Sequence, residues 1–429
     1  MKVAILTMFA GLSTTYSLVN VVADQIKMLL DAQVELKILV SETCPDQERW
    51  GVFLDPRLEW IKITNTCNGV PIVWHDYSTP TGVVHEAFFQ EAECIAKDYV
   101  RYLQDVDICI MHDILYQGWH LVHNVAIREA QKSLPKVSFL AFTHSLPVNH
   151  PQKMEWPFSA RFTPMPNTRF VYPTHSGIEA LARQYDVPLG NCAVVYNSLP
   201  LLELLSQDVQ QVADSIDLLN ADILVTYPGR LTTGKRFEKV AALSGAIQRK
   251  TELRTKVIFC DFPSADIPSG IYKRTIQTEG MKFGLEKEDL IFTSDLGYEQ
   301  GFPRRGVFEL FSLSNLFICP SYSESFGLTV LEAASRGNFL VLNEAVPALK
   351  ELGDSLGAYF LRWDGRNFGY DTHEKYVPSE QAYYEEHGGI IVNLMREDRS
   401  LWAKTKTRTK YHGAWICRNQ LMPLLTGTM

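Results

Sequence analysis

The charged residues best suited to chemistry lie in the second half of the chain, beginning with the stretch Gly229-Arg-Leu-Thr-Thr-Gly-Lys235. Its spacing matches the phosphate loop G-x-x-x-x-G-K, but that loop continues with a Ser or Thr that holds magnesium, and here Arg236 follows. A kinase or ATPase would therefore lack a metal ligand. Arg230 and Lys235 can instead converge on one anion, because a guanidinium fork and an ammonium point charge together suit a pyrophosphate. The alternative is a solvated basic helix start, where both cations would oppose the helix dipole.

A second stretch, residues 320–334, carries Glu324 and Glu332 eight positions apart. An apolar strand-like run ends at Pro320, Ser and Gly residues then favour a turn, and residues 328–335 have a helical pattern. Free backbone N–H groups at such a helix start favour an anion. If the segment between the carboxylates is largely helical, they lie about 12 Å apart, near the span from sugar to ribose in a nucleotide sugar. Carboxylates also bind sugar hydroxyls through charge-assisted hydrogen bonds. The alternative is that both are ordinary surface charges near a helix N-terminus.

Together the patterns Gly-Arg-x4-Lys and Glu-Ser-Phe-Gly-x4-Glu-Ala resemble the donor-binding signature of the retaining glycosyltransferases of family four, which have the GT-B fold. Three further segments are similar to landmarks of that family. Tyr196-Asn197-Ser198 resembles a turn at the end of its first domain, Phe142-Thr-His144 resembles a strand-end histidine, and the segment around Trp415 resembles a helix that crosses back to the first domain. The resemblance spans most of the chain, and its specific motifs lie in the second half.

The resemblance implies a role for each matching residue. Arg230 and Lys235 would bind the donor diphosphate, Glu324 the transferred sugar and Glu332 the ribose. His144 would face the sugar from the acceptor side, so the implied catalytic set is Glu324, His144, Lys235 and Arg230. The other implied donor-binding positions are Gly11, Gly229, Leu296, Ser325, Phe326, Gly327, Leu328 and Thr329.

The chain departs from the family pattern at three places. The glycine that usually follows the lysine is Arg236, a glycine-rich turn is replaced by Cys260-Asp-Phe-Pro, and the paired glycines of the first loop are reduced to Gly11. These departures affect the contact expected for the nucleotide base and the geometry of the loops.

Two further features concern the acceptor. His112 and Asp113 follow an apolar run and are candidates for the acceptor side, although a histidine at a strand end is often structural. The basic run at residues 404–410 is interpreted as a solvated helix face, with contact to an anionic acceptor such as nucleic acid or phospholipid as the alternative.

Apolar runs that alternate with helical patterns supply the scaffold. Alternation of this kind predicts parallel sheets covered on both faces, here two doubly wound Rossmann-like α/β domains that face each other across a cleft, as in the GT-B type. Ligands of such sheets bind beyond the carboxyl ends of the strands, where His112, Asp113, His144, Arg230 and Glu324 all fall. The expected strands are residues 2–7, 35–40, 106–111, 137–142, 170–172 and 193–196, then 223–227, 256–259, 290–293, 316–319 and 339–342; the clearest helices are 18–30, 86–103 and 328–335.

Length and composition limit the number of domains and the classes of protein to which the chain can belong. A chain of 429 residues predicts two domains: residues 1–205 on the acceptor side and 206–407 for the nucleotide sugar, with a polar connection at 201–219 and the C-terminal helix at about 408–429 packing back on the first domain. A net charge of -8 argues against a surface built to coat nucleic acid. The eight cysteines include no CxxC pair, and no apolar run reaches the ~18 residues of a membrane span. These features favour free thiols and a cytoplasmic protein.

The function expected from this sequence is transfer of a sugar, with retention, from a UDP- or GDP-sugar to an acceptor hydroxyl, with no metal and no cofactor beyond the nucleotide-sugar co-substrate. The acceptor stays open among a sugar, a lipid, a small metabolite, a protein and a nucleic acid. The alternatives are a nucleotide-sugar epimerase, an inverting transferase on the same fold, and a non-catalytic nucleotide-sugar-binding protein.

Overall fold

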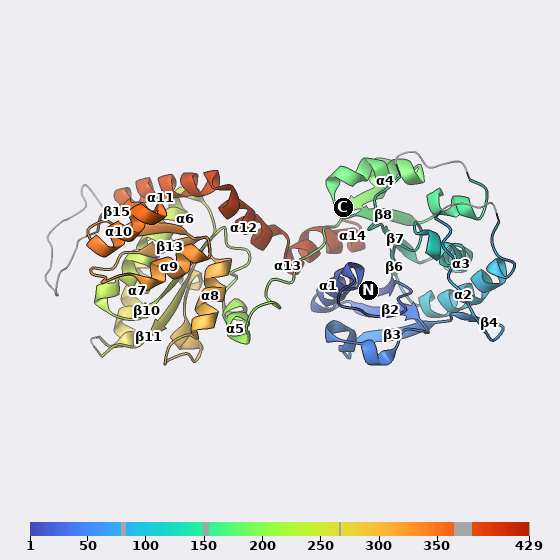
Figure 1. Cartoon of the computed structure of the whole chain (residues 1–429), viewed down its shortest axis with the longest axis horizontal. Coiled ribbons are helices and arrows are strands. Elements are labelled where there is room, and N and C mark those ends of the chain that lie inside the picture. Colours follow the sequence, from blue (N-terminus) through green and yellow to red (C-terminus); the bar gives the residue numbers. More distant parts are fainter. Residues whose placement is uncertain (79–82, 149–153, 266, 364–379, 429) are drawn as a thin grey trace. The chain divides into compact units, whose positions relative to one another are not determined.

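The computed structural model describes residues 1–78, 83–148, 154–265, 267–363 and 380–428. The chain forms two compact units, each built on its own sheet (Figure 1). Unit 1 comprises Met1–Leu199 and Gly413–Met429, and unit 2 comprises Pro200–His412. The boundaries expected from the sequence were 205/206 and 407/408, so residues 200–205 and 408–412 lie in unit 2 instead.

Unit 1 has a seven-stranded sheet in the order β3-β2-β1-β6-β7-β8-β9. Every neighbouring pair is parallel. The order runs outward from β1 in both directions, which is the doubly wound Rossmann-like arrangement expected from the sequence. A short antiparallel hairpin lies in the loop after β3. The strands are β1 (Lys2–Leu6), β2 (Glu35–Ser41), β3 (Leu58–Ile63), β6 (Ile108–His112), β7 (Ser138–Phe142), β8 (Thr168–Tyr172) and β9 (Cys192–Val194), and the hairpin is β4 (Thr66–Cys67) with β5 (Val70–Pro71).

Both faces of this sheet are buried, which explains the continuous apolar runs of its central strands. Side chains alternate between two cores along each strand. Val3 and Ile5 of β1 enter the core beneath α1, whereas Ala4 and Leu6 enter the core beneath α2 and α3. The chain's last residues complete the first of these cores, with Ile416 and Leu421 among its members. The helices are α1 (Ser17–Asp31), α2 (Phe88–Leu103), α3 (Leu121–Gln131), α4 (Ile178–Tyr185), α13 (Gly413–Ile416) and α14 (Met422–Thr426).

Unit 2 repeats the plan with a six-stranded parallel sheet in the order β12-β11-β10-β13-β14-β15. This again is a doubly wound order, and the predicted fold class is confirmed for both units. That the units face each other across a cleft stays a prediction. The strands are β10 (Ile223–Arg230), β11 (Thr255–Phe262), β12 (Leu290–Phe292), β13 (Leu316–Cys319), β14 (Phe339–Asn343) and β15 (Tyr359–Leu361).

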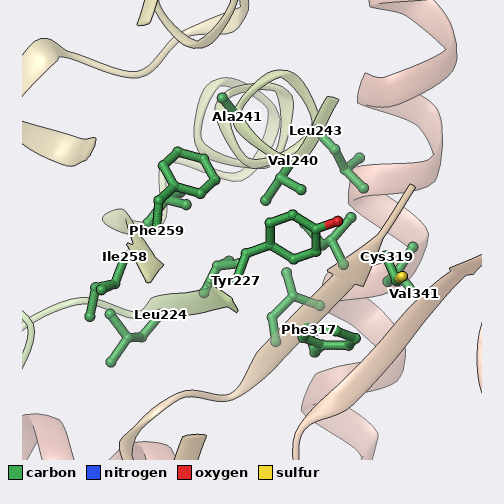
Figure 2. Packing of buried hydrophobic residues seen from close by; sticks show 14 of the residues in the cluster. Leu224, Tyr227, Val240, Ala241, Leu243, Ile258, Phe259, Phe317, Cys319 and Val341 are labelled. Carbon is green, nitrogen blue, oxygen red and sulfur yellow. The ribbon is translucent and has the colours of Figure 1, made fainter. Parts of the chain in front are cut away.

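The core of unit 2 lies between this sheet and its helices. Figure 2 shows Tyr227 of β10 surrounded by Val240 of α6 and Phe317 of β13, with its hydroxyl end pointing toward Cys319. α6 packs against α7 and α11, whereas α8 packs against α5, α9 and β10. The helices are α5 (Gln207–Ser215), α6 (Phe237–Thr251), α7 (Ser269–Phe283), α8 (Arg304–Leu313), α9 (Leu328–Ser335), α10 (Pro347–Leu356), α11 (Glu380–Glu397) and α12 (Arg399–Lys410).

Two expectations need correction. Residues 201–219 are not a polar connection, because α5 belongs to unit 2 and buries Val209 and Val212 in its core. The basic run at residues 404–410 is not a fully solvated face. Lys404 Nζ donates to the backbone oxygens of Phe311 and Arg336 at 3.0 and 2.7 Å. Arg408 is 2% exposed and donates to the backbone oxygens of Leu218 and Ala221 at 2.7 and 2.5 Å. These two cations satisfy buried carbonyl groups within unit 2.

Candidate functional site

The reversal of strand order in unit 2 brings two loops together. β10 lies between β11 and β13, so the chain leaves β10 and β13 side by side at the same edge of the sheet. Doubly wound sheets bind their ligands at this point. Residues 231–236 follow β10 and residues 320–327 follow β13. Both charged stretches singled out in the sequence therefore meet at the ligand-binding edge.

The loop after β10 presents two cations. Arg230 ends the strand with an exposed side chain, and among the described residues it has no hydrogen-bond or ion-pair partner. Lys235 ends a single 3₁₀ turn, Thr233–Lys235. Gly229 is not required by packing, since a Cβ there would meet the ring of Phe237 at an ordinary 3.6 Å. Any need for glycine at this position would come from a ligand that approaches the backbone.

The loop after β13 presents backbone donors. Gly327 caps α9 with a φ of 95°, a left-handed conformation that glycine adopts without strain, and no described side chain caps the helix. The first N–H groups of α9, at Leu328 and Thr329, have no partner within the helix. Ser325 and Phe326 are exposed beside them. This end of α9 therefore combines free N–H groups with the positive end of the helix dipole, which suits a phosphate.

The two loops are fastened to each other by contacts that sequence reasoning missed. Lys235 Nζ is paired with Glu324 Oε1, and the backbone N–H of Tyr322 donates to the oxygen of Gly234 at 2.9 Å. The hydroxyl of Tyr227, which is buried, donates to the backbone oxygen of Lys235 at 2.7 Å and lies 3.4 Å from Ser321 Oγ. Tyr227 thus holds both loops from beneath. Nothing in its sequence position distinguishes it from an ordinary core tyrosine.

Arg236 stands at the position where the sequence resemblance had led us to expect a glycine. Arg236 has a φ of 53°, in the left-handed region where glycine is favoured. Its guanidinium lies 3.7 Å from the ring centre of Tyr322 and donates to the Tyr322 hydroxyl at 2.9 Å. A cation over an aromatic ring is stabilising, most of all when it is shielded from water, and Arg236 is 3% exposed. Arg236 therefore adopts a backbone conformation that favours glycine, while its side chain joins the two loops.

Two further predicted donor residues lie on neighbouring elements. Glu332 is on α9 and accepts from Arg304 Nη2 at 3.0 Å; because Arg304 is mostly exposed, this pair is weak and easily exchanged. Only the part of the Glu324–Glu332 segment from Leu328 onward is helical, so the 12 Å estimate for a helical segment does not apply. Leu296 ends the 3₁₀ turn Thr293–Leu296 that follows β12, two strands away from β10.

In unit 1, the equivalent reversal of strand order lies between β1 and β6. Gly11 is in the loop after β1, and a Cβ there would lie 2.9 Å from Oε2 of Glu48. That same oxygen accepts the backbone N–H of Leu12 at 2.9 Å. The absence of a side chain at Gly11 therefore lets Glu48 hold the loop.

The predicted acceptor-side residues form one hydrogen-bonded chain at this edge. His112 Nε2 lies 2.9 Å from Gln25 Oε1, and His112 Nδ1 lies 2.9 Å from His144 Nε2. Burial lowers the pKa of His144 to about 4, and burial beside His144 lowers the pKa of His112 well below its ordinary value. Both rings are therefore neutral near pH 7. If Gln25 Oε1 accepts from His112, then His112 Nδ1 accepts from His144, and Nδ1 of His144 is left as a hydrogen-bond acceptor.

Asp113 completes this group. It has a φ of 58°, and its Oδ1 accepts the backbone N–H of His144 at 2.9 Å. Burial raises the pKa of the Asp113 carboxyl to about 6, although the hydrogen bonds from His144 and Gln117 act in the opposite direction. His112 is 1% exposed and lies behind His144, so it is placed to orient His144 rather than to contact a substrate.

Two properties of the described part of the chain concern metals and membranes. Its His, Cys, Asp and Glu side chains form no group of three or more that could hold a metal ion. None of its helices has the length and apolar character needed to cross a bilayer.

No family model and no curated protein matches the chain. Solved structures do resemble it. A glycosyltransferase from Rickettsia africae is 12% identical with a TM-score of 0.36, HepE of Anabaena in complex with UDP is 11% identical with a TM-score of 0.34, and sucrose-phosphate synthase from Thermosynechococcus elongatus is 14% identical with a TM-score of 0.37. Each alignment covers 100% of both chains. At such low identities and TM-scores, we carry no residue assignment over from these structures.

Proposed function

We propose that the chain is a glycosyltransferase whose unit 2 binds a nucleoside-diphosphate sugar, UDP- or GDP-linked, at the edge where β10 and β13 end. One observation carries the proposal: Arg230 at the end of β10, Lys235 and the start of α9 lie at adjacent strand ends, and the Glu324 carboxylate is paired with that lysine. Among the described residues, the Arg230 side chain has no partner and no side chain caps α9. The cations and the helix end suit a diphosphate. The carboxylate beside them suits the hydroxyls of a sugar attached to that diphosphate.

The ion pair between Lys235 and Glu324 leaves the lysine able to bind a phosphate as well. An ammonium group has three N–H donors, and among the described residues only Glu324 takes one from Lys235. The remaining two are free for phosphate oxygens. Lys235 can therefore bind the leaving group while it still orients the carboxylate that would hold the sugar.

The proposed reaction is transfer with retention of configuration. The diphosphate leaves the sugar, and Arg230, Lys235 and the first N–H groups of α9 stabilise the charge that develops on it. The acceptor hydroxyl attacks from the face that the phosphate leaves, and a phosphate oxygen takes the hydroxyl proton. The cations supply the stabilisation that a metal would otherwise give, so we expect no metal requirement. Glu332 would bind the ribose, and His144 would accept a hydrogen bond from the sugar.

The test uses the purified full chain, a panel of nucleotide sugars, and the variants Lys235→Ala and Glu324→Gln. Loss of one preorganised donor to a developing anion typically lowers turnover by ~10²–10³-fold, and we expect at least this effect on donor hydrolysis or transfer. The matched control is Lys256→Ala, which breaks an ion pair with Asp289 of similar burial near the start of β11. Near-normal turnover in both site variants would contradict the proposal.

Two readouts separate the alternatives. The anomeric configuration of the product, followed by NMR, distinguishes retention from inversion, and a donor whose sugar changes configuration without transfer indicates an epimerase. Full activity in EDTA is expected; a strict magnesium requirement would point to an ATP-dependent phosphotransferase. Tight donor binding with no turnover at all would identify a nucleotide-sugar sensor.

A further inference from the structure

A cavity lies at the edge of the unit 1 sheet where β1 and β6 end. It has a volume of about 230 Å³, and its lining includes residues 7–11 together with Tyr16, Trp74, Asp113, Gln117 and Trp119. All of these residues belong to unit 1. From this cavity we infer that unit 1 binds a neutral, polyhydroxylated ring, a sugar of one residue or the terminal residue of a glycan, as the acceptor of the transfer reaction.

The aromatic lining is the first argument. The aromatic rings of Phe9, Tyr16, Trp74 and Trp119 line the cavity, and those of Tyr16 and Trp119 are 49% and 40% exposed. Large aromatic side chains left accessible in a cavity are available to a ligand. A sugar ring presents a flat face of C–H groups, which packs on an aromatic surface, while its hydroxyls point outward at the rim. The lining is therefore suited to a ring that is apolar on its faces and polar at its edge.

The polar lining is the second argument. Asp113 and Gln117 are among the lining side chains that can accept or donate hydrogen bonds, and a buried carboxylate binds a hydroxyl strongly. No Lys or Arg is among the described residues that line the cavity. A phosphate, a carboxylate or a nucleic-acid backbone would meet Asp113 without a compensating cation. The charge distribution therefore selects a neutral ligand and excludes an anionic acceptor.

The size of the cavity is the third argument. Sites for drug-sized ligands occupy ~300–1,000 Å³, and this one is smaller, at about 230 Å³. It has room for one ring, and any larger part of the acceptor would lie outside it. Among the acceptor classes left open by the sequence, this size favours a sugar or a cyclic polyol.

Contacts within unit 1 hold the loops that line the cavity in place before any ligand binds. Trp74 donates through Nε1 to Asn65 Oδ1 at 2.9 Å, and its ring centre lies 5.2 Å from that of His120. Gly118 packs so closely that a Cβ on it would lie 2.2 Å from the backbone nitrogen of Ser78. Arg161 then ties these two loops together by donating to the backbone oxygens of Tyr77 and Tyr116 at 3.0 and 2.8 Å. A ligand therefore meets a site that needs little ordering on binding.

Backbone strain gives an independent sign of function. Met8 and Asp113 both line the cavity, and both adopt left-handed conformations with φ of 55° and 58°. Such conformations cost non-glycine residues about 1–3 kcal/mol, and they gather at binding and catalytic sites. Asp113 directly follows β6 and Met8 lies two residues after the end of β1, so both are at the ends of the strands that define the switch point.

The role of this ring as acceptor rests on the proposed function, whereas its binding to unit 1 does not. The experiment therefore measures sugar binding to the full chain in the absence of any nucleotide. Methyl glycosides of the common hexoses and pentoses are screened by saturation-transfer NMR, together with hexose phosphates and hexuronic acids. We expect at least one neutral glycoside to bind and the matching anionic sugars to bind at least tenfold more weakly.

Variants then locate the site. Trp119→Ala and Asp113→Asn should each weaken binding of that glycoside at least tenfold, and Trp119→Phe should restore part of it. Trp119 is exposed, so its removal should leave the fold intact; circular dichroism and thermal unfolding check this. The matched control, Trp402→Ala, removes an indole that is 48% exposed in unit 2 and should change nothing.

The outcomes separate the two proposals. If no neutral glycoside binds while nucleotide sugars are bound and hydrolysed, the cavity assignment is wrong and the donor assignment stands. The assignment also fails if glycosides bind equally to wild type, Trp119→Ala and Asp113→Asn. If glycosides bind in the cavity but no nucleotide sugar is turned over, the proposed function fails and the sugar site remains. If Trp119→Ala abolishes transfer but keeps donor hydrolysis, both hold.

Discussion

The buried hydroxyl of Tyr227 offers a sharp test of how unit 2 holds its candidate donor site. The change Tyr227→Phe removes one oxygen and keeps the ring, whose centre lies 4.9 Å from that of Phe237. The backbone oxygen of Lys235 then loses its 2.7 Å hydrogen bond. A buried carbonyl left without a donor costs about 1–3 kcal/mol. For a unit of this size each kcal/mol lowers Tm by ~2–4 °C, so a decrease of roughly 2–12 °C is expected.

The same change should also affect donor handling, because Lys235 sits on the loop that Tyr227 holds. A displacement of about 1 Å in a positioned group can lower the rate ~10²-fold, and we expect kcat/KM for the nucleotide sugar to fall by roughly 10–100-fold. Thermal unfolding gives the first quantity and steady-state hydrolysis or transfer gives the second. The stability loss alone does not predict the kinetic loss, so the two measurements are independent.

The control is the neighbouring residue on β10. Thr226 is buried, and its hydroxyl lies 2.6 Å from Ser314 Oγ on the opposite face of the sheet from Tyr227. Thr226→Val removes a buried hydrogen bond of similar length without touching either loop. It should lower Tm by a similar amount and leave kcat/KM unchanged. If Tyr227→Phe behaves like Thr226→Val, with stability lost and kinetics intact, Tyr227 does not position the loops.

Three further predictions concern the stability of variants at one buried carboxyl group and at two residues with left-handed backbone conformations. The pKa of Asp113 is raised to about 6 in the folded chain, so between pH 4 and 6 the native state binds more protons than the unfolded state, and the free energy of unfolding falls as pH rises through that window. Asp113→Asn removes this effect, so in urea unfolding the variant should gain about 1–3 kcal/mol in stability relative to the wild type between pH 4 and pH 7. Parallel stability-against-pH curves for the two proteins would contradict the shift. Gly327→Ala should lower the free energy of unfolding by about 1–3 kcal/mol and weaken donor binding, because the φ of Gly327 is 95° and an added Cβ would lie 3.3 Å from Leu352 and Val330. The control is Gly357→Ala: its φ is 71° and no atom lies within 4 Å of an added Cβ, so it should show the cost of backbone strain alone. Arg236→Gly should be more stable than Arg236→Ala by about 1–2 kcal/mol in chemical unfolding, because both lose the stacking on Tyr322 but only alanine keeps the left-handed strain.

The central strands could be predicted from the sequence because both faces of each sheet are buried, which makes these strands continuous apolar runs. β3 and β15 were missed, and both lie at sheet edges. In β3, Leu-Glu-Trp-Ile-Lys-Ile, charged residues interrupt the apolar pattern, as an edge permits. β10 extends three residues beyond the predicted strand, so Gly229 and Arg230 belong to the strand itself.

Some residues of the candidate site could likewise be predicted from the sequence, and others could not. Arg230, Lys235 and Glu324 could be found because their charges stand out after apolar strands. The residues that fasten the loops could not. The contact between Tyr322 and Gly234 depends on which strands are neighbours, and that between Tyr227 and Lys235 depends on how the loop after β10 folds back over its own strand. Lys404 and Arg408 looked solvated for a related reason. Their partners are backbone carbonyls far away in the sequence, and these carry no sequence signal.

The return of the chain to unit 1 has a consequence for protein synthesis. Ile416, Leu421, Leu424 and Leu425 fill the core beneath α1, yet they are synthesised more than 200 residues after Leu199. At ~5–20 residues per second, the time between completion of Leu199 and completion of Leu425 is roughly 10–50 s. During that interval the apolar face of α1 lacks these residues as cover, so nascent unit 1 should need a chaperone's protection until they have been made. A premature stop codon after His412 would leave unit 2 whole and unit 1 permanently open.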